Sequence, residues 1–468
     1  MGAAILHAEP SEANPLGTQP IGKLLLKFAI PTITSSLVTA AYNITDQIFI
    51  GHGVGYLGNA ATNIAFPLST LCLAVSIMLG QGSASHFNLS LGAGHKEEAA
   101  EVAGTGISLS AIFGLLIGLL AFFFTEPLMR VFGATAQIFP YAVTYTHIIA
   151  LGLPFLVFSS ACSNLIRSDG SPNYSLLCVA AGTILNIILN PIFIFVFHWG
   201  VAGSAYATVI SQVVSFILTV AYLWHFKSIA FHRRLLLLQA NCIIAIAKLG
   251  VPGFLNQFMM MIVQITMNLT LNAFGATSIY GSDIPLAVVG VISKLNVILV
   301  AFTVGIALGA QPIFGFNYGA KNYARVKATY KLAAVVVLIS STIFFLCFQL
   351  FPRQIVSIFG SGSEAYFAFA ERYMRIYMML VFLFGLQPLT ANFFTSIGKA
   401  YKGLFITMTR QGLFLLPLLL LLPRFFGLDG AMYAGPVSDT AAALLAIFFA
   451  ARELAHITRL EQGLQAAG

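Results

Sequence analysis

The chain has 468 residues, of which 58% are hydrophobic and only 8% are charged, and its mean hydropathy is +0.90. A soluble domain carries about 25% charged residues, and a single water-bathed core stops growing near about 250 to 300 residues. These values exclude a water-soluble fold. The solvent for most of the surface must be a lipid bilayer.

The formal charge of +8 is unevenly distributed along the chain. Sixteen of the 23 Lys and Arg fall at the two termini and in the loops that share a side with them, whereas Arg130, Arg353 and Arg424 lie opposite. By the positive-inside rule we expect both termini in the cytoplasm. No basic stripe with interleaved aromatic residues is present, so nucleic acid is not an expected partner.

The cysteines and the N-terminus exclude other classes. The five Cys show no CxxC spacing, so neither a disulfide framework nor a zinc site is predicted. The first twenty residues lack a short apolar region followed by a small-residue cleavage site. We therefore expect no cleaved signal peptide.

Twelve apolar stretches are long enough to cross the hydrocarbon as helices, which satisfy their own backbone hydrogen bonds. The predicted spans are 27–50, 58–83, 102–125, 137–160, 173–197, 201–225, 249–274, 284–312, 330–351, 366–390, 402–425 and 429–451.

The two halves of the chain repeat one another with a shift near 227. The recurring pairs are Gly92-Ala93 with Gly319-Ala320, Phe132-Gly133 with Phe359-Gly360, Asn164 with Asn392, Ser168 with Ser396, Gly170 with Gly398, Gly200 with Gly427, Gly203 with Gly430, Tyr206 with Tyr433, Ala207 with Ala434 and Ser211 with Ser438. Near the starts of the halves, Pro31 parallels Pro252.

An even number of spans per half brings both copies into the membrane from the same side, so the repeat axis must follow the membrane normal. We predict an all-α membrane protein with two six-helix lobes and a substrate cleft between them, as in parallel-repeat transporters. No GxxxxGK[ST] phosphate loop is present, so an ion gradient must supply the energy. The predicted parts are an N-terminal tail (1–20), the first lobe (21–226), a linker (227–247), the second lobe (248–452) and a C-terminal tail (453–468).

Several segments resemble one transporter family. They are Tyr42–Gly51 (YNITDQIFIG), Leu91–Glu98 (LGAGHKEE), Arg167–Pro172 (RSDGSP), Asn186–Phe193 (NIILNPIF) and Gln311–Ala320 (QPIFGFNYGA). In these motifs the chain is similar to the multidrug and toxin extrusion (MATE) family, in its bacterial DinF-like and MepA-like branch. The resemblance implies twelve helices in two lobes and cation-coupled antiport of organic, often cationic amphipathic compounds.

Asp46 is the first candidate for coupling, because a carboxylate deep in a membrane span is costly and normally faces a bundle interior or cavity. Tyr42 and Asn43 lie one turn earlier, within reach of a hydrogen bond. The resemblance makes the acid at this position a proton or cation site. The alternative is a structural carboxylate that caps local hydroxyls and amides.

The fifth span adds Asn186 and Asn190, which share one helix face. Many members of the similar branch have Asp before Pro-Ile-Phe, where this chain has Asn190. Because an amide does not titrate, a relay of two carboxylates is in doubt, although Asp46, Asn186 and Asn190 offer oxygen ligands for Na⁺. The alternative for the two amides is a structural link between helices. Thr208 matches a hydroxyl that lines the same family pocket.

The second lobe offers a predicted substrate cavity lined by Met260, Gln264, Lys294, Gln311 and Asp439. Lys294 and Asp439 are predicted to form a buried ion pair, because an unpaired charge at that depth is too costly. For Arg410 we expect bonds to backbone carbonyls or a head group that reaches the cytoplasmic surface.

The sequence thus predicts a monomeric efflux antiporter that needs no cofactor, is driven by H⁺ or alternatively Na⁺, and takes small organic cations as substrates. Two other functions stay open. A lipid-linked oligosaccharide flippase of the same superfamily would need a more charged cavity than these spans provide. A membrane-embedded enzyme would need clustered His and acids, yet no HExxH or GxSxG motif occurs.

Overall fold

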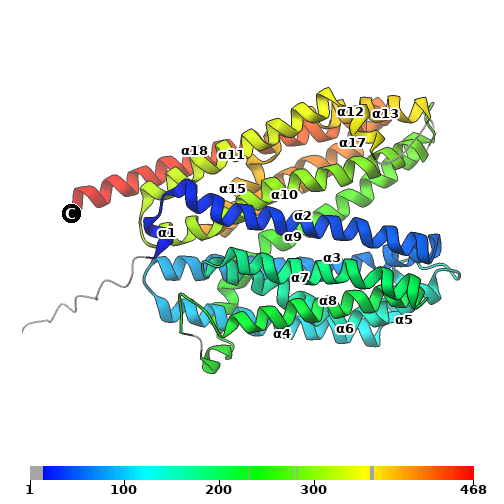
Figure 1. The fold of residues 1–468 in the computed structure, drawn as a ribbon. Coiled ribbons are helices and arrows are strands. Elements are labelled where there is room, and N and C mark those ends of the chain that lie inside the picture. Colours follow the sequence, from blue (N-terminus) through cyan, green and yellow to red (C-terminus); the bar gives the residue numbers. More distant parts are fainter. Residues whose placement is uncertain (1–13, 231, 277, 282, 359–362, 468) are drawn as a thin grey trace, which may run out of the picture.

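The computed structural model describes residues 14–467 apart from 231, 277, 282 and 359–362, and the regular structure in this part of the chain is helical (Figure 1). Eleven helices are long and apolar enough to cross a membrane, and two helices that meet at a bend of 47° make a twelfth crossing. The predicted all-α fold class with twelve spans is therefore confirmed.

The crossings of the first half are α2 (Ile21–Gly53), α3 (Tyr56–Gly92), α4 (Lys96–Phe123), α6 (Phe139–Ser168), α7 (Pro172–Pro191) with its π-helical continuation (Ile192–Val196), and α8 (Gly200–Leu223). Those of the second half are α9 (Ala240–Gly275), α10 (Asp283–Gly319), α11 (Tyr323–Leu350), the bent pair, α16 (Ala400–Met408) with α17 (Leu416–Phe426), and α18 (Leu428–Ala467). The short helices α1 (Pro15–Thr18), α5 (Thr125–Val131) and α12 (Pro352–Ser357) and a 3₁₀ turn (Arg233–Leu236) lie in the connections.

The helices are longer than the apolar stretches that predict them. The 37 residues of α3 span about 55 Å, whereas the hydrocarbon core is about 30 Å thick. Helix α9 begins at Ala240, within the range assigned to the linker, and α18 continues to Ala467 through the range assigned to the C-terminal tail. Helical hydrogen bonding does not stop at the hydrocarbon boundary, because polar helix ends are solvated there.

The tenth crossing is broken, although a continuous span over 366–390 was predicted. It consists of α13 (Glu364–Tyr377), α14 (Val381–Phe384) and α15 (Leu386–Ser396), with a turn at residues 378–380. Pro388 lies in the first turn of α15, where its missing N–H breaks no helical hydrogen bond. Mean hydropathy averages the apolar character of a window of residues and does not detect a change in helix direction.

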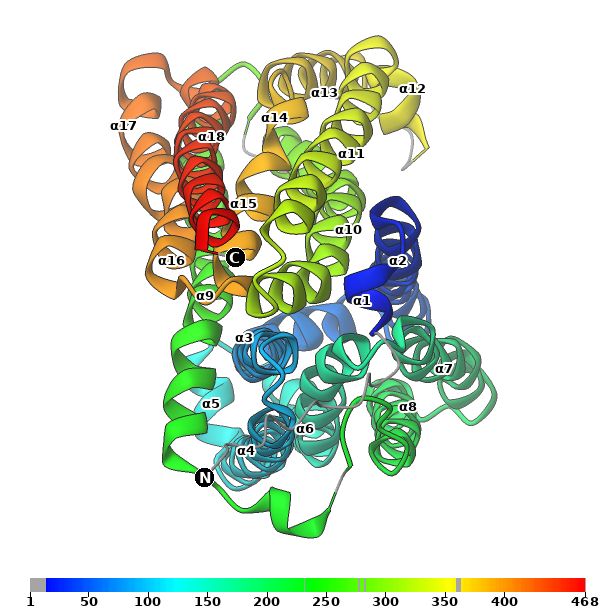
Figure 2. The same ribbon diagram turned by 90° about the vertical axis from the view of Figure 1, so that its left-hand side faces the viewer.

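The helices form two groups (Figures 1 and 2). Viewed from the end where the C-terminus lies, α3 to α8 form one group and α10 to α18 the other, with α2 and α9 running between them (Figure 2). Buried apolar side chains of α3, α4 and α6, among them Cys72, Val102 and Leu153, form the core of the first group. Two further clusters fill the second group.

The first helix of each half begins against the other group. Leu24 and Phe28 of α2 pack in a second-group cluster with Ala310 of α10. Cys242 and Ile246 of α9 pack in the core of the first group. The two halves therefore exchange the starts of their first helices across the pseudo-twofold axis.

Two repeated glycines bring α3 and α10 into reciprocal contact on this axis. A Cβ placed on Gly92 would lie 2.0 Å from the carbonyl oxygen of Phe316, and one on Gly319 would lie 2.2 Å from that of Leu89. Phe316 lies 227 positions after Leu89 and is its counterpart in the repeat, so the pseudo-twofold axis relates the two contacts. Both positions require glycine, because any side chain would overlap the facing backbone.

A polar contact joins the groups near these glycines. The Gln311 Nε2 donates to Ser85 Oγ at 2.9 Å, and Gln311 is 3% exposed. We call this region, made by Ser85, Leu89, Gly92, Gln311, Phe316 and Gly319, the seam. It lies toward the end of the molecule where α1 and the end of α18 lie (Figure 1).

Asp169, just after α6, fixes the connection that leads toward α9. Its carboxylate accepts hydrogen bonds from the Tyr222 hydroxyl at 2.7 Å, from the Lys227 N–H at 2.7 Å and from the Ser228 N–H at 2.8 Å. Asp169 is 2% exposed. The side chain thus holds the segment after α8 against the end of α6.

Candidate functional site

Asp46 lies on α2 where this helix packs against α7 and α8. Asp46 is 9% exposed. Its Oδ1 accepts hydrogen bonds from the Asn190 Nδ2 of α7 and from the Ser204 Oγ of α8, the latter at 3.0 Å. Two polar hydrogen atoms therefore compensate part of the cost of burying this group.

The hydrogen bonds continue from Asp46 along α7 to α8. The Asn190 Nδ2 also donates to Asn186 Oδ1 at 3.3 Å, and the Asn186 Nδ2 donates to Thr208 Oγ1 at 3.1 Å. Four side chains singled out in the sequence are thus brought together by three helices. We call Asp46, Asn186, Asn190, Ser204 and Thr208 the first-lobe network.

Ser204 is the member of this network that the sequence analysis missed. It lies four residues before Thr208, so both hydroxyls share one face of α8. That spacing was the available signal. Asn43 was expected to bond Asp46, but it lies on an exposed part of α2, outside the network.

A cavity of about 260 Å³ adjoins the network. Tyr42, Asn186 and Thr208 line it together with apolar side chains such as Phe155 and Leu73. Gln212 and Ser159, which also line it, each hold a buried side-chain oxygen with no hydrogen-bond partner in the described part of the chain. The cavity therefore combines apolar walls with unsatisfied acceptors, as ligand pockets do.

The network offers one carboxylate for a cation. Among the described residues, no group of three His, Cys, Asp or Glu could hold a metal ion. A Na⁺ would therefore depend on Asp46 with amide and hydroxyl oxygens. The Asn190 amino group lies between Asp46 Oδ1 and Asn186 Oδ1, while the Asn190 Oδ1 is buried and has no hydrogen-bond partner among the residues that the structure describes. In this arrangement a hydrogen-bond donor occupies the place between oxygens where a cation would sit.

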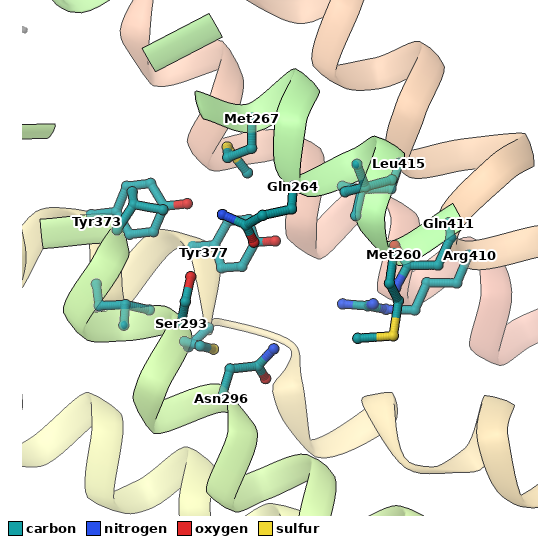
Figure 3. Close-up of a pocket in the computed structure, with 14 residues that line it drawn as sticks. Met260, Gln264, Met267, Ser293, Asn296, Tyr373, Tyr377, Arg410, Gln411 and Leu415 are labelled. Carbon is teal, nitrogen blue, oxygen red and sulfur yellow. The ribbon is translucent and has the colours of Figure 1, made fainter. Parts of the chain in front are cut away.

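The second group contains another pocket, of about 100 Å³ (Figure 3). Met260 and Gln264 of α9, which were assigned to a substrate cavity, lie on its wall. Ser293 and Asn296 of α10 lie opposite Arg410 (Figure 3).

The predicted ion pair between Lys294 and Asp439 is wrong. Asp439, 5% exposed, accepts a hydrogen bond from Arg410 Nε at 2.5 Å, and the Arg410 guanidinium lies 4.4 Å from the centre of the Phe384 ring. Lys294 is exposed on α10. Arg410 lies in the segment between α16 and α17, and this segment packs against α18, which carries Asp439.

Gln311 was also assigned to the substrate cavity, yet it belongs to the seam and lines neither pocket. Its amide bridges α10 and α3 rather than facing a ligand. The expectation for Arg410 is corrected as well, because its partner is a carboxylate rather than backbone carbonyls or the membrane surface.

Comparisons with known proteins agree with this architecture. The sequence profile of the MatE family matches residues 31–192 and 255–421, once in each half. The multidrug export protein MepA of Staphylococcus saprophyticus is 25% identical over 431 residues, covering 91% of this chain and 92% of that protein. MepA of Staphylococcus haemolyticus is 26% identical and covers 92% and 93%.

Solved structures share the fold. An outward-facing multidrug resistance MATE transporter has a TM-score of 0.88 at 23% identity, covering 96% of this chain and 99% of that one. A MOP superfamily transporter from Pyrococcus furiosus, described as having a binding pocket of reverse polarity, has a TM-score of 0.87 at 24% identity, covering 96% and 100%. With two matches to the family profile and twelve crossings in two groups, the chain belongs to the MATE family of membrane transporters.

Proposed function

We propose that this transporter exports organic, often cationic amphipathic compounds from the cell in exchange for H⁺, with Asp46 as the coupling residue. The observation that carries the proposal is a single buried carboxylate beside a cavity of about 260 Å³. The multidrug export proteins that the chain is similar to support the substrate class.

A charged carboxylate at this depth costs roughly 2.5 to 3.5 kcal/mol on insertion scales, so any partner that neutralises it is favoured. A substrate cation in the adjoining cavity and a proton on Asp46 both neutralise it, and they compete because only one of them is needed. Protonation then releases the drug, and deprotonation restores the site. Such competition is the basis of exchange.

The amide of Asn190 favours H⁺ over Na⁺. Its amino group donates to Asp46 and to Asn186, which suits an anionic carboxylate. Turned by half a rotation, the same amide would present its oxygen to Asp46 and accept a proton from the neutral acid. The pair therefore suits both protonation states of Asp46 without a bound ion.

Exchange also requires that the transporter be closed on one side of the membrane while its binding sites are open to the other. We infer that the seam provides this closure. From the positive-inside rule we expect the termini, and with them the seam, on the cytoplasmic side of a bacterial inner membrane. We infer a monomer that rocks about the axis between α3 and α10, opening the seam to load substrate. The pockets of the two lobes then face the outside while the seam is closed.

The test is uptake of ethidium into inside-out vesicles under an imposed pH gradient or an imposed Na⁺ gradient. We expect the pH gradient alone to drive uptake, and Asp46→Asn to abolish it while the protein still inserts and folds. Asn43→Ala, three residues away on the exposed part of α2, is the matched control and should transport normally. Full uptake by the Asp46→Asn variant, or uptake that responds only to Na⁺, would contradict proton coupling at Asp46. Uptake that responds to neither gradient would contradict antiport and favour a flippase.

A further inference from the structure

We call the pocket that Arg410 lines the second-lobe pocket, and the cavity beside the first-lobe network the first-lobe cavity. The two occupy corresponding places in the two halves of the repeat. Arg410 follows the start of α16 at Ala400 by ten residues, just as Gly182 follows the start of α7 at Pro172. The shift of 227 that pairs Ser211 with Ser438 also pairs Gln212 with Asp439. Gly182 and Gln212 line the first-lobe cavity, and Arg410 lines the second-lobe pocket. An ion pair thus replaces two uncharged residues at equivalent positions.

Arg410 is held so that its terminal nitrogens face the pocket. Among the described residues Arg410 donates through Nε to Asp439, which does not line the pocket. The Phe384 ring contacts the guanidinium as a second support. A guanidinium has five N–H donors in a fixed plane, so four remain, and Figure 3 shows the group directed into the space beside Asn296.

The local backbone brings a second polar side chain to the same place. A π-helical segment, Thr409–Leu415, joins α16 to α17 and contains Arg410 and Gln411, each 8% exposed. π-Helical turns inside helices occur frequently at functional sites. The Gln411 Oε1 is buried and has no hydrogen-bond partner among the described residues. A buried oxygen that lacks a donor is destabilising, and a half rotation of this amide would place its amino group, a donor, where the oxygen now lies, so that a ligand oxygen could accept from it.

The rest of the wall fits the head group of an amphiphile. Ser293, Asn296 and Tyr377 add hydroxyl and amide groups, and Met260 and Leu415 add apolar surface. No acidic side chain is among the described residues that line the pocket, and the carboxylate of Asp439, which pairs with Arg410, lies outside the wall, so the pocket presents the guanidinium to a ligand. A volume of about 100 Å³ accepts a small head group and excludes a whole drug molecule.

We propose that this pocket binds the carboxylate of an acidic or zwitterionic amphiphile, through the terminal nitrogens of Arg410 and the amide of Gln411. The inference rests on the proposed function, since it adds a second substrate class to the same transporter. Arg binds a carboxylate by two parallel hydrogen bonds, which are stronger than those between neutral groups. The ester of the same compound keeps its shape and loses this interaction.

The experiment measures binding of rhodamine B, which carries a free carboxylate, and of its ethyl ester to the purified full-length protein by fluorescence anisotropy. We expect the acid to bind about tenfold tighter than the ester, the preference expected from one charge-assisted hydrogen bond. The double variant Arg410→Gln, Asp439→Asn keeps a hydrogen-bonded pair without charge and should lose this preference. Gln411→Leu, which leaves the ion pair intact, should reduce it severalfold.

Lys294→Gln is the control, because it removes a positive charge from α10 without altering the wall of the pocket. It should keep the full preference for the acid. An equal preference in the wild type and in both pocket variants would overturn the inference, as would its loss in Lys294→Gln. If either result is found while ethidium uptake still follows the pH gradient, the inference about the pocket fails and the proposed efflux function stands. If the preference holds and ethidium is not transported, the pocket stands and the efflux function fails.

Discussion

Replacing Gly319 by Ala should open the seam. The added Cβ would lie 2.2 Å from the Leu89 carbonyl oxygen, whereas ordinary contacts begin at 3.4 Å, so α3 and α10 must separate locally by about 1.2 Å. Overpacking of this kind typically costs about 1 to 3 kcal/mol. At about 2 kcal/mol, the ratio of closed to open seam falls about 30-fold. The symmetry mate Gly92→Ala, at 2.0 Å from Phe316, should act in the same direction.

The assay is the rate at which a maleimide labels a cysteine introduced at Ser85, which is fully buried in the seam. Cys347, the exposed native cysteine, is first replaced by Ser, and the other four cysteines are buried. We expect labelling at least tenfold faster in the Gly319→Ala protein. Gly290→Ala on the same helix, α10, is the matched control, because a Cβ at Gly290 would meet no atom within 4 Å. Equal labelling rates in the two folded variants would refute the role assigned to the seam glycines.

Three further predictions concern single side chains. Asp439→Asn should lower the free energy of unfolding by about 3 to 5 kcal/mol, because it leaves the Arg410 charge buried without a partner. Adding Arg410→Gln should raise the melting temperature again in a thermal unfolding experiment. Equal stability of the single and double variants would contradict this. Asp169→Asn should lower the free energy of unfolding by about 1 to 3 kcal/mol, since the amino group of the new Asn must face one of the three hydrogen-bond donors. The melting temperature should fall relative to that of an Asn173→Ala control, which changes an exposed residue at the start of α7. Asn190→Leu removes the amide that bonds Asp46 and should reduce pH-driven ethidium uptake about tenfold or more; unchanged uptake would separate Asn190 from coupling.

The fold could be predicted because hydropathy and repetition depend on local sequence. All twelve crossings follow from the length of apolar stretches, and the two-lobe arrangement follows from the parallel repeat. The break before α14 could not be predicted, since residues 378–380 are Met-Met-Leu and include no proline or glycine. Breaks of this kind depend on the packing of neighbouring helices.

The first-lobe network could be predicted in large part, because one buried acid and amides at a helical spacing restrict the geometry. Asp46, Asn186, Asn190 and Thr208 lie together. The choice of a partner for Asp439 could not be predicted, because it depends on the relative rotation of helices that are distant in the chain. The seam glycines illustrate the same limit, since the repeat identified both residues and the carbonyl that each one faces became known only from the fold.

The exchange of helix starts between the lobes has a consequence for how the chain can be divided. Because α2 begins in the core of the second lobe and α9 begins in that of the first, neither half of the polypeptide carries a complete set of partners for its own core. Each half expressed alone would expose apolar positions that only the other half covers. Two separate genes encoding the halves, cut in the connection after α8, should therefore yield a stable protein only when they are expressed together. A six-helix polypeptide with this architecture would be able to cover its core only by pairing with a second copy in the same orientation.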